Sequence, residues 1–276
     1  MFCHNMNIIK LRTHYRGVRS ARKLVLNLYS DSPDFSKLRI LPQSLKKMKT
    51  LYSLKIYFSF LRQLKDHSVR EILNGFKGTK SLKMLSFEFQ NCINVSSYAF
   101  EGLKNSFGCT AKELEVNFNF RDCSRKLDDS TLKHISRIVP RNKNITSLNL
   151  NILNCYQITE KGRKFLGKAL HKANTLQSIK LNLKSPAEGS EQEFLLYAFY
   201  KLRPLKKLSI EYEKDSLLTD SMVSALGRAL QMTPLLEIFK LKIPRASSLT
   251  ARSLRYLTEG IKVTTSLKEL GLDLSD

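Results

Sequence analysis

One apolar frame recurs nine times along the chain, and this repetition restricts the possible folds more than any other feature. Its template is L-x-x-L-x-L-x-L, seen clearly at Ile145, Leu148, Leu150 and Ile152. The last three apolar residues alternate with polar ones, which is typical of a strand buried on one face. We call the first of these three the anchor of its unit. The anchors are Leu24, Leu54, Leu85, Leu114, Leu148, Ile179, Leu208, Phe239 and Leu270.

The anchors lie 29 to 34 residues apart, which is a period of repeat proteins. A second apolar pattern, with helical spacing, ends about nine residues before most anchors. It consists of two apolar residues at i and i+4, usually with a small residue at i+3, as in Leu166, Ala169 and Leu170. These positions form one stripe of a helix, and we expect the small residue to let that helix lie close to the sheet.

The remaining helical trios follow the same pattern. They are Leu41/Ser44/Leu45, Ile72/Gly75/Phe76, Ile135/Ile138/Val139, Leu195/Ala198/Phe199, Leu226/Ala229/Leu230 and Leu257/Gly260/Ile261. In the fourth unit the trio Leu103/Ser106/Phe107 lies two residues nearer to its anchor than the others do.

Polar residues predict where several helices begin. Ser68-x-x-Glu71 and Ser190-x-x-Glu193 are typical of capping boxes. Thr159 and Thr219 are expected to be N-caps. Pro42 lies inside the first predicted helix, and we expect it to shorten that helix or make it irregular.

Each unit therefore consists of a strand, a loop, a helix and a second loop. A single unit cannot bury both its strand face and its helix stripe, whereas stacked units can. The sequence predicts an α/β solenoid of about nine units, a horseshoe with parallel strands on the concave face and helices on the convex face. Residues 1–20 form a basic N-terminal segment in this interpretation, and residues 21–276 form the repeat domain.

The last strand, ending LGLDLSD, has no polar capping unit after it. An uncapped edge strand invites pairing with another chain. We therefore expect the chain to be part of a longer protein, or a partner to cover this end.

Residues 158–183, ITEKGRKFLGKALHKANTLQSIKLNL, resemble the ribonuclease-inhibitor type of leucine-rich repeat, especially the longer repeats of ciliates and other protists. The resemblance covers roughly residues 21–276 and implies a horseshoe for protein–protein recognition, without a cofactor or an active site. The family's asparagine in the turn after the strand is found only at Asn91 and Asn154. Less regular loops are expected in the units that place Ser30, Phe60, Phe120 or Lys214 there.

The chain is strongly basic, with 47 Lys and Arg against 24 Asp and Glu and a net charge of +23. Such a charge attracts phosphates, anionic lipid headgroups and acidic proteins alike. On the predicted concave positions the basic residues exceed the acidic ones by only 4, which argues against a phosphate-binding groove there. A basic patch in the N-terminal third favours nucleic acid or an acidic surface, or else belongs to a helix that covers the first repeat. Its residues are Arg12, Arg16, Arg19, Arg22 and Lys23.

An uncharged polar patch is predicted at the centre of the concave face. In the frame above, Asn117, Asn151 and Asn182 occupy the same position in three consecutive units, with Asn149 and Lys180 beside them. Neighbouring strands lie about 4.8 Å apart, so these side chains should stack. Two interpretations remain open. The amides either satisfy one another as a ladder, or they form a partner-binding patch.

The densest helical charge is a group of five cations, which we interpret as a solvated outer face, with an acidic-partner site as the alternative. They are Lys161, Arg163, Lys164, Lys168 and Lys172.

Cys92, Cys123 and Cys155 recur near the repeat period, but no histidine or acidic residue recurs beside all three. Buried structural thiols are therefore favoured over a metal site. The histidines are dispersed, and no glycine-rich phosphate loop is present, so we predict no metal, no cofactor and no catalysis.

The predicted function is a non-catalytic protein–protein interaction scaffold that binds a partner on the repeat surface. The alternatives are a nucleic-acid-associated protein that uses the basic N-terminal third, and a regulator of a small GTPase. The 5 cysteines are scattered without a CxxC, and neither a secretory signal nor a long apolar span is recognisable. These features favour reduced thiols and an intracellular location, cytoplasmic or nuclear.

Overall fold

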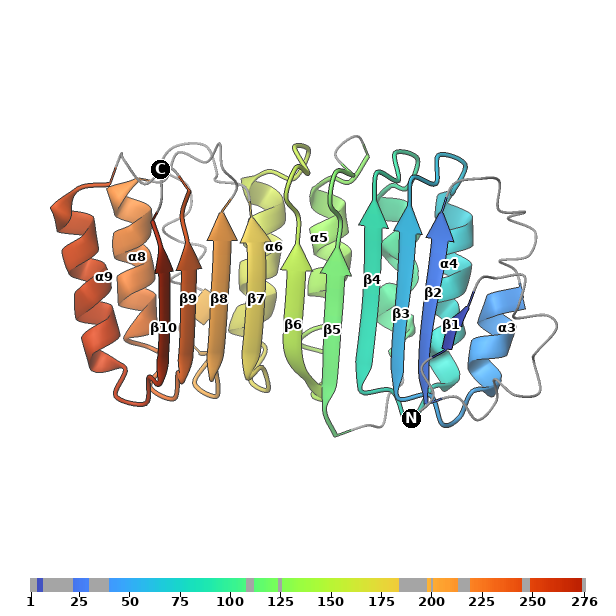
Figure 1. Cartoon of the computed structure of the whole chain (residues 1–276), viewed down its shortest axis with the longest axis horizontal. Helices are drawn as coiled ribbons and strands as arrows, with labels where there is room; N and C mark the ends of the chain where they lie inside the picture. The colour runs from blue at the N-terminus through green and yellow to red at the C-terminus, as the bar shows by residue number, and fades with distance from the viewer. Residues whose placement is uncertain are drawn as a thin grey trace.

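The structure is a computed structural model that describes residues 4–6, 22–29, 40–107, 112–123, 126–183, 198–199, 201–212, 219–244 and 249–274. It contains one parallel sheet of ten strands in chain order, and all the arrows in Figure 1 point the same way. The strands are β1 (His4–Met6), β2 (Lys23–Tyr29), β3 (Ser53–Ser59), β4 (Met84–Gln90), β5 (Leu114–Asn119), β6 (Ile145–Asn151), β7 (Ser178–Leu183), β8 (Lys207–Tyr212), β9 (Ile238–Lys242) and β10 (Glu269–Asp273).

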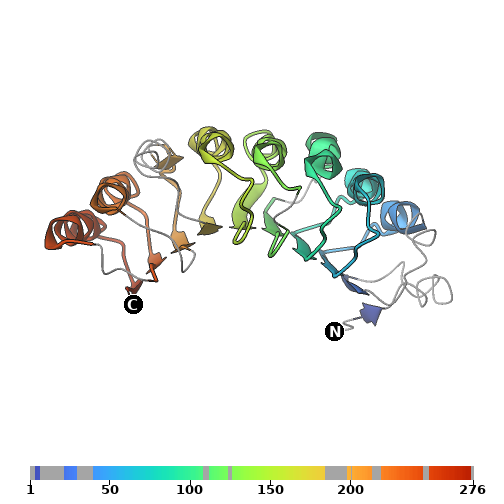
Figure 2. The same ribbon diagram turned by 90° about the horizontal axis from the view of Figure 1, so that it is seen from above.

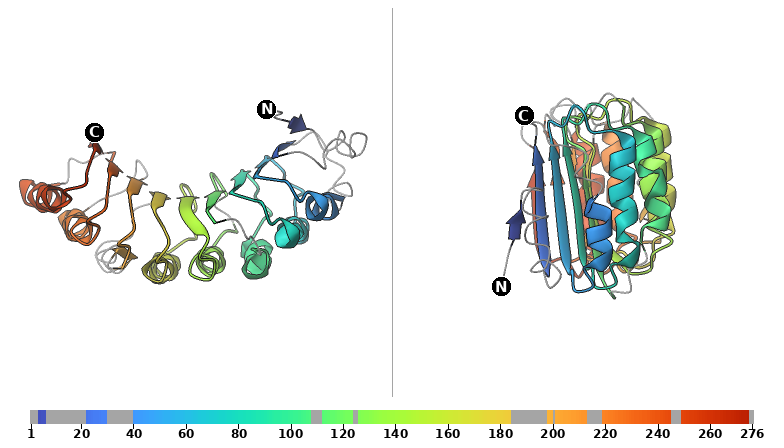
Figure 3. Two further views of the ribbon diagram at one scale, coloured as in Figure 1. Left: turned by 90° about the horizontal axis from the view of Figure 1, so that it is seen from below. Right: turned by 90° about the vertical axis from the view of Figure 1, so that its right-hand side faces the viewer.

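Helices alternate with the strands and cover one face of the sheet. They are α3 (Ile40–Lys47), α4 (Asp66–Asn74), η2 (Gly75–Gly78), η3 (Ser97–Asn105), α5 (Asp129–Ser136), α6 (Glu160–His171), α8 (Asp220–Leu230) and α9 (Ala251–Val263). Seen end-on in Figure 2, the helices lie on the outer side of an open arc and the strands on its inner side. Both views in Figure 3 show the same two layers. The predicted α/β solenoid of about nine units, with concave strands and convex helices, is confirmed.

The core is continuous from unit to unit because each strand pairs only with its neighbours in sequence. The inward residues Leu148, Leu150 and Ile152 are buried, and the same holds for their counterparts from β2 to β9. Each such side chain contributes roughly 1.5–3 kcal/mol by leaving water. Phenylalanines stack across the early strands, with the rings of Phe58 and Phe89 4.7 Å apart. The repeated apolar frame is therefore the interior of the solenoid.

The predicted anchor of the fourth unit is wrong by two residues. The register pairs Leu85 with Val116, and Val116 with Leu148, so the anchor is Val116 rather than Leu114. The error arose because β5 and the residue after it offer four alternating apolar side chains, all of them buried, and the frame fits them twice. Leu114 instead pairs with Ile145, beside a shift of register. With Val116 as anchor, the trio ending at Phe107 lies nine residues before its anchor, as the other trios do.

The turn after the strand has a fixed backbone geometry. Phe60, Asn91, Asp122 and Asn154 each lie six residues after an anchor, and each has a φ between 52° and 60°. Asparagine and aspartate tolerate this left-handed conformation better than phenylalanine does. In the fourth unit the turn residue is therefore Asp122, and the buried Phe120 belongs to the core. The asparagine side chain of Asn154 donates to Asp122 Oδ1 at 2.6 Å and links the two turns.

The small residues of the helical trios were expected to face the sheet, but the glycines among them face a neighbouring helix. A Cβ added to Gly260 would lie 2.1 Å from the carbonyl oxygen of Gly227 in the neighbouring helix α8. A Cβ added to Gly75 would lie 2.7 Å from Pro42 in α3. Small side chains thus let one helix approach the next helix, rather than the sheet.

The predicted helix starts are partly correct. Thr159 is the N-cap of α6, and its side chain accepts from the Lys161 amide, whereas Thr219 caps α8 without such a bond. Helix α4 begins at Asp66 after Lys65, so Ser68 is not its cap. Pro42 lies in the first turn of α3, where its missing N–H removes no helical hydrogen bond. The capping box expected at Ser190–Glu193 lies outside the described residues.

The two outermost strands differ from the inner ones. Strand β1 pairs in parallel with Leu24–Leu26 of β2, which places a strand inside the segment predicted as a basic N-terminal extension. Strand β10 forms the opposite edge, and its Leu270 and Leu272 are 47% and 42% exposed. Their counterparts in β9, Phe239 and Leu241, are buried. The apolar interior is therefore open at the β10 edge.

Candidate concave asparagine site

Five asparagines form an uncharged patch on β5, β6 and β7, at the centre of the concave face. We call them the asparagine patch: Asn117, Asn119, Asn149, Asn151 and Asn182. The register places Asn119, Asn151 and Asn182 side by side in one row, and Asn117 beside Asn149 in the next. The predicted stacking of Asn117 on Asn151 is therefore wrong, since it followed from the incorrect fourth anchor. Asn119 was missed for the same reason.

Two of the patch residues use their oxygens to fix the start of the following turn. Asn119 Oδ1 accepts from the Arg121 amide at 3.2 Å, and Asn151 Oδ1 accepts from the Leu153 amide at 3.0 Å. Neither side-chain NH₂ group donates a hydrogen bond to a residue that the structure describes. Both amides therefore offer two donors to a ligand.

Two further patch residues bond sideways to the strands that flank them. Asn117 donates from Nδ2 to Ser86 Oγ at 3.0 Å, and Asn182 donates to Glu211 Oε2 at 3.1 Å. Asn182 is only 8% exposed, and its Oδ1 is buried without a hydrogen-bond partner among the described residues. A buried acceptor without a partner is uncommon, because its desolvation is uncompensated.

The five amides do not satisfy one another. Within the described part of the chain, no hydrogen bond joins one side-chain amide of the patch to another, although register places them on adjacent strands. Asn149 makes no side-chain hydrogen bond to any described residue, and Lys180 is exposed beside it. The self-satisfied ladder is thus not what the structure contains, and the patch has unused donors and acceptors.

A charged row flanks the patch on its C-terminal side. Toward the C-terminus, Lys242 lies 3.9 Å from Glu211 and 3.6 Å from Asp273, and Lys240 lies 2.6 Å from Glu269. Toward the N-terminus, burial and the neighbouring Glu88 raise the pKa of Tyr57. The ion pairs balance one another across strands, so the concave face as a whole carries little of the excess charge.

The repeating cysteines form a structural column under the turns. Cys92, Cys123 and Cys155 are buried, and each thiol donates to a backbone carbonyl of the preceding unit at 3.2–3.5 Å. The hydrogen bond with Cys92 and burial both raise the pKa of the Cys123 thiol. A buried thiol whose pKa is raised, such as that of Cys123, is a poor nucleophile and a poor ligand. Among the described residues no group of three or more His, Cys, Asp or Glu side chains is arranged to hold a metal ion.

The predicted basic groups are only partly described. Arg22 is exposed just before β2, and Lys23 is half-buried at its start, while Arg12, Arg16 and Arg19 lie outside the described residues. On α6 and at its end, four of the five predicted outward cations are exposed: Lys161, Lys164, Lys168 and Lys172. Arg163 is buried, so its assignment to the solvated face is wrong.

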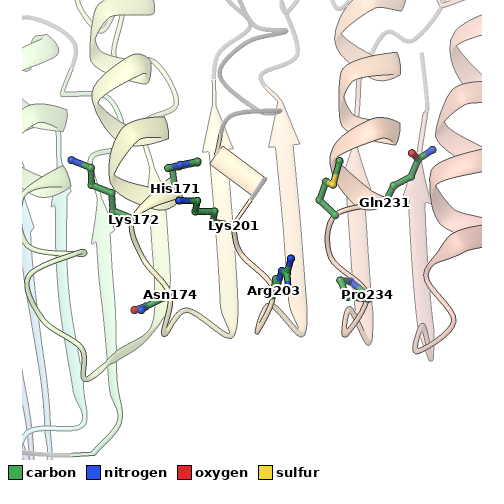
Figure 4. A pocket seen from close by; sticks show the side chains of 8 residues that line it. His171, Lys172, Asn174, Lys201, Arg203, Gln231 and Pro234 are labelled. Carbon is green, nitrogen blue, oxygen red and sulfur yellow. The ribbon is translucent and has the colours of Figure 1, made fainter.

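One hollow of about 970 Å³ opens where α6 and α8 end. Figure 4 shows the side chains around it, from the helix ends to the loops that lead into the strands. None of the described residues that line it is acidic. The lining residues are His171, Lys172, Asn174, Lys201, Arg203, Gln231, Met232 and Pro234.

Comparison with known proteins finds similarity to solved structures but not to a family or a curated sequence. No family model and no curated protein matches the sequence. Among solved structures, the chain is similar to leiomodin-1 actin-binding site 2, with 13% sequence identity and a TM-score of 0.34. That alignment covers 84% of this chain and 91% of the other. In the part of the chain that the structure describes, no helix is long and apolar enough to cross a membrane.

Proposed function

We propose that the protein is a non-catalytic, intracellular scaffold that binds a protein partner on its concave face, with the asparagine patch at the centre of the contact. The observation that carries this proposal is the unused hydrogen-bonding capacity of adjacent amides, above all Asn149, which is partly exposed and makes no side-chain hydrogen bond to any described residue. Polar groups that a fold leaves without partners are available to a ligand's main-chain or side-chain groups. The free buried thiols support an intracellular location.

The rigidity of the sheet supports the same proposal. Asn151 and its neighbours lie on strands held by parallel pairing on both sides, so their backbone positions exist before any partner arrives. A preformed surface loses little conformational freedom on binding, which favours affinity. Side-chain amides present both a donor and an acceptor, the combination needed to bind a peptide group.

Comparative affinity capture with paired variants tests the proposal. The concave variant is Asn149→Ala with Asn151→Ala, and its matched control is Asn174→Ala with Gln231→Ala, which removes two exposed amides from the hollow. We expect a defined set of proteins to be retained by the wild type and by the control but lost from the concave variant. Identical retention by both variants would refute the concave site. Circular dichroism of each variant checks that folding is unchanged.

A further inference from the structure

The excess positive charge of the protein is concentrated along one rim of the solenoid. Positions eight, seven and five residues before each anchor carry no acidic residue in any of the nine units. Ten described cations occupy these positions, and all ten are exposed. We call them the basic rim: Lys46, Lys47, Lys49, Lys80, Arg141, Lys143, Lys172, Lys201, Arg203 and Lys262.

The basic rim follows one edge of the fold because its positions lie between the end of a helix and the start of the next strand. In Figure 1 this is the lower edge, along which every helix ends and every strand begins. The helices are parallel to one another in the end-on view of Figure 2. The cations therefore project from one extended, level edge that runs from α3 to α9, rather than from a groove.

Most of the rim cations are not used inside the protein. Lys46, Lys49, Arg141, Lys143, Lys172, Lys201, Arg203 and Lys262 form no ion pair with any carboxylate that the structure describes. Some cations elsewhere are paired with carboxylates, as Lys164 is with Glu160 at 2.6 Å. Two carboxylates, Glu113 and Glu237, lie in the same loops, and Glu237 is bound to Lys268 at 2.9 Å.

Helix dipoles explain only part of this arrangement. A cation in the last turn of a helix is stabilised by the negative end of the helix dipole. Arg141 and Lys143, however, lie five and seven residues beyond Ser136, where α5 ends. Lys49 and Arg203 also lie in loops rather than in helices. These loop cations point to an external anion.

We propose that the basic rim binds the surface of an anionic membrane. A level row of cations fits a plane of lipid headgroups, and lysines attract such a surface without needing specific geometry. Eight of the ten rim residues are lysine, whereas a site built for bidentate phosphate recognition favours arginine. Exposed aliphatic side chains also lie at the C-terminal part of this edge, at Met232 (42%), Leu235 (51%) and Val263 (56%). Aliphatic groups beside lysines suit the boundary between headgroups and acyl chains.

The hollow between α6 and α8 is part of this surface. It gathers Lys172, Lys201 and Arg203 around one opening, next to Met232 and Pro234. Three cations line a space of about 970 Å³, which leaves room for a whole lipid headgroup. The hollow is therefore where the membrane contact should be strongest.

Vesicle co-sedimentation of the full chain tests the proposal. Phosphatidylcholine vesicles containing phosphatidylserine should bind the protein, pure phosphatidylcholine vesicles should not, and binding should weaken as salt is raised from about 50 to 500 mM. The rim variant Lys143→Ser, Lys172→Ser, Arg203→Ser should bind about a hundredfold more weakly. Its control, Arg62→Ser, Lys161→Ser, Arg252→Ser, removes the same charge from the opposite edge and should bind within about threefold of the wild type.

Three results would overturn the membrane proposal. One is equal weakening by the rim and control variants, which would show attraction by net charge alone. Another is the absence of binding to phosphatidylserine vesicles by the wild type at low salt. The third combines two observations: mixed-sequence RNA or DNA displaces the protein from vesicles, and the rim variant has lost its affinity for nucleic acid. Together they would show that the rim is a nucleic-acid site. Thermal unfolding of each variant excludes misfolding as the cause, and capture through the asparagine patch is measured separately.

Discussion

At the rim where the helices begin, carboxylates join one unit to the next, whereas at the rim where they end, cations face solvent. Asp129, in the first turn of α5, accepts from the Thr159 amide and hydroxyl at 2.7 Å and from the Gly162 amide at 2.9 Å. Asp66 binds Ser96 in the same way, and Asp220 binds Thr250. Each aspartate thus binds the N-cap residue of the next helix.

The two rims differ in how their charged side chains are bonded, and the helix dipole alone does not explain this difference. The dipole favours anions where helices begin and cations where they end, so it accounts for the sign on each rim. It does not account for the difference in bonding. The aspartates are bonded within the fold and stabilise the stacking of units, while most basic-rim residues pair with no carboxylate that the structure describes and can contact something outside.

The largest effect is expected in the core that lies between the two rims. Leu181→Ala or Leu226→Ala should lower the free energy of unfolding by about 2–5 kcal/mol, because both side chains are buried and their removal leaves a cavity. Urea unfolding followed by circular dichroism measures this loss. Lys164→Ala is the exposed control and should be nearly neutral. Equal losses from the core and control changes would contradict the assigned faces.

A smaller loss is expected where a carboxylate joins two units. Asp129→Ala removes three charge-assisted hydrogen bonds from the start of α6 and should cost about 1–3 kcal/mol of unfolding free energy. The control is Asp128→Ala, which removes only a hydrogen bond to Ser130 within its own helix. Chemical denaturation of both variants gives the difference in unfolding free energy that is due to contact between units. A loss no greater than that of the control would show that the aspartate does not connect units.

The same rim should make stability sensitive to acid. The hydroxyl and amide of Thr250, together with Ser253, hold the pKa of Asp220 below its usual value. A carboxyl group whose folded pKa is lowered stabilises the protein above its unfolded pKa and loses that contribution as the pH falls through the folded pKa. The drop in melting temperature between about pH 5 and pH 3 should therefore be smaller in Asp220→Asn than in the wild type. If the melting temperature of the variant depends on pH as that of the wild type does, Asp220 does not contribute to the acid sensitivity.

The smallest effect is expected at the basic rim. Lys143→Ala should change the free energy of unfolding by less than about 0.5 kcal/mol, since its side chain is exposed and has no carboxylate partner that the structure describes. Removing a charge from a protein of net charge +23 also reduces self-repulsion. Denaturation in parallel with Asp129→Ala gives the direct contrast. A loss as large as that of Asp129→Ala would mean that the rim is structural.

The repeat predicted the fold well because the same positions of the repeat are buried in one unit after another. Alternating apolar residues such as Leu148 and Leu150 fix which strand face is inside, and the trios fix the helix stripes. What the pattern could not fix was register in a unit that offers more apolar positions than the frame needs. In β5, Leu114, Val116 and Phe118 all satisfy alternation, and only pairing with β4 and β6 selects Val116. The uneven steps of 29 and 34 residues on either side of Leu114 were the available signal.

The candidate site was predictable in kind but not in detail. Counting within the repeat located asparagines on the concave face, yet it omitted Asn119 and misplaced Asn117. The absence of hydrogen bonds between the amides depends on side-chain rotamers, which no spacing rule gives. Likewise, the hydrogen bonds that Asp66, Asp129 and Asp220 accept from the following helix could not be read from residue types, because an aspartate in the first turn of a helix usually stabilises that same helix.

Disulfide trapping tests the strand register on which the asparagine patch depends. With Val116 as the fourth anchor, Asn119→Cys and Asn151→Cys lie on neighbouring strands directly opposite each other, whereas Asn117→Cys and Asn151→Cys are offset by two residues. Under mild oxidation the first pair should form a disulfide readily and the second should not, as read by thiol counting in the folded protein. Rapid bonding of the second pair, with none in the first, would contradict the account.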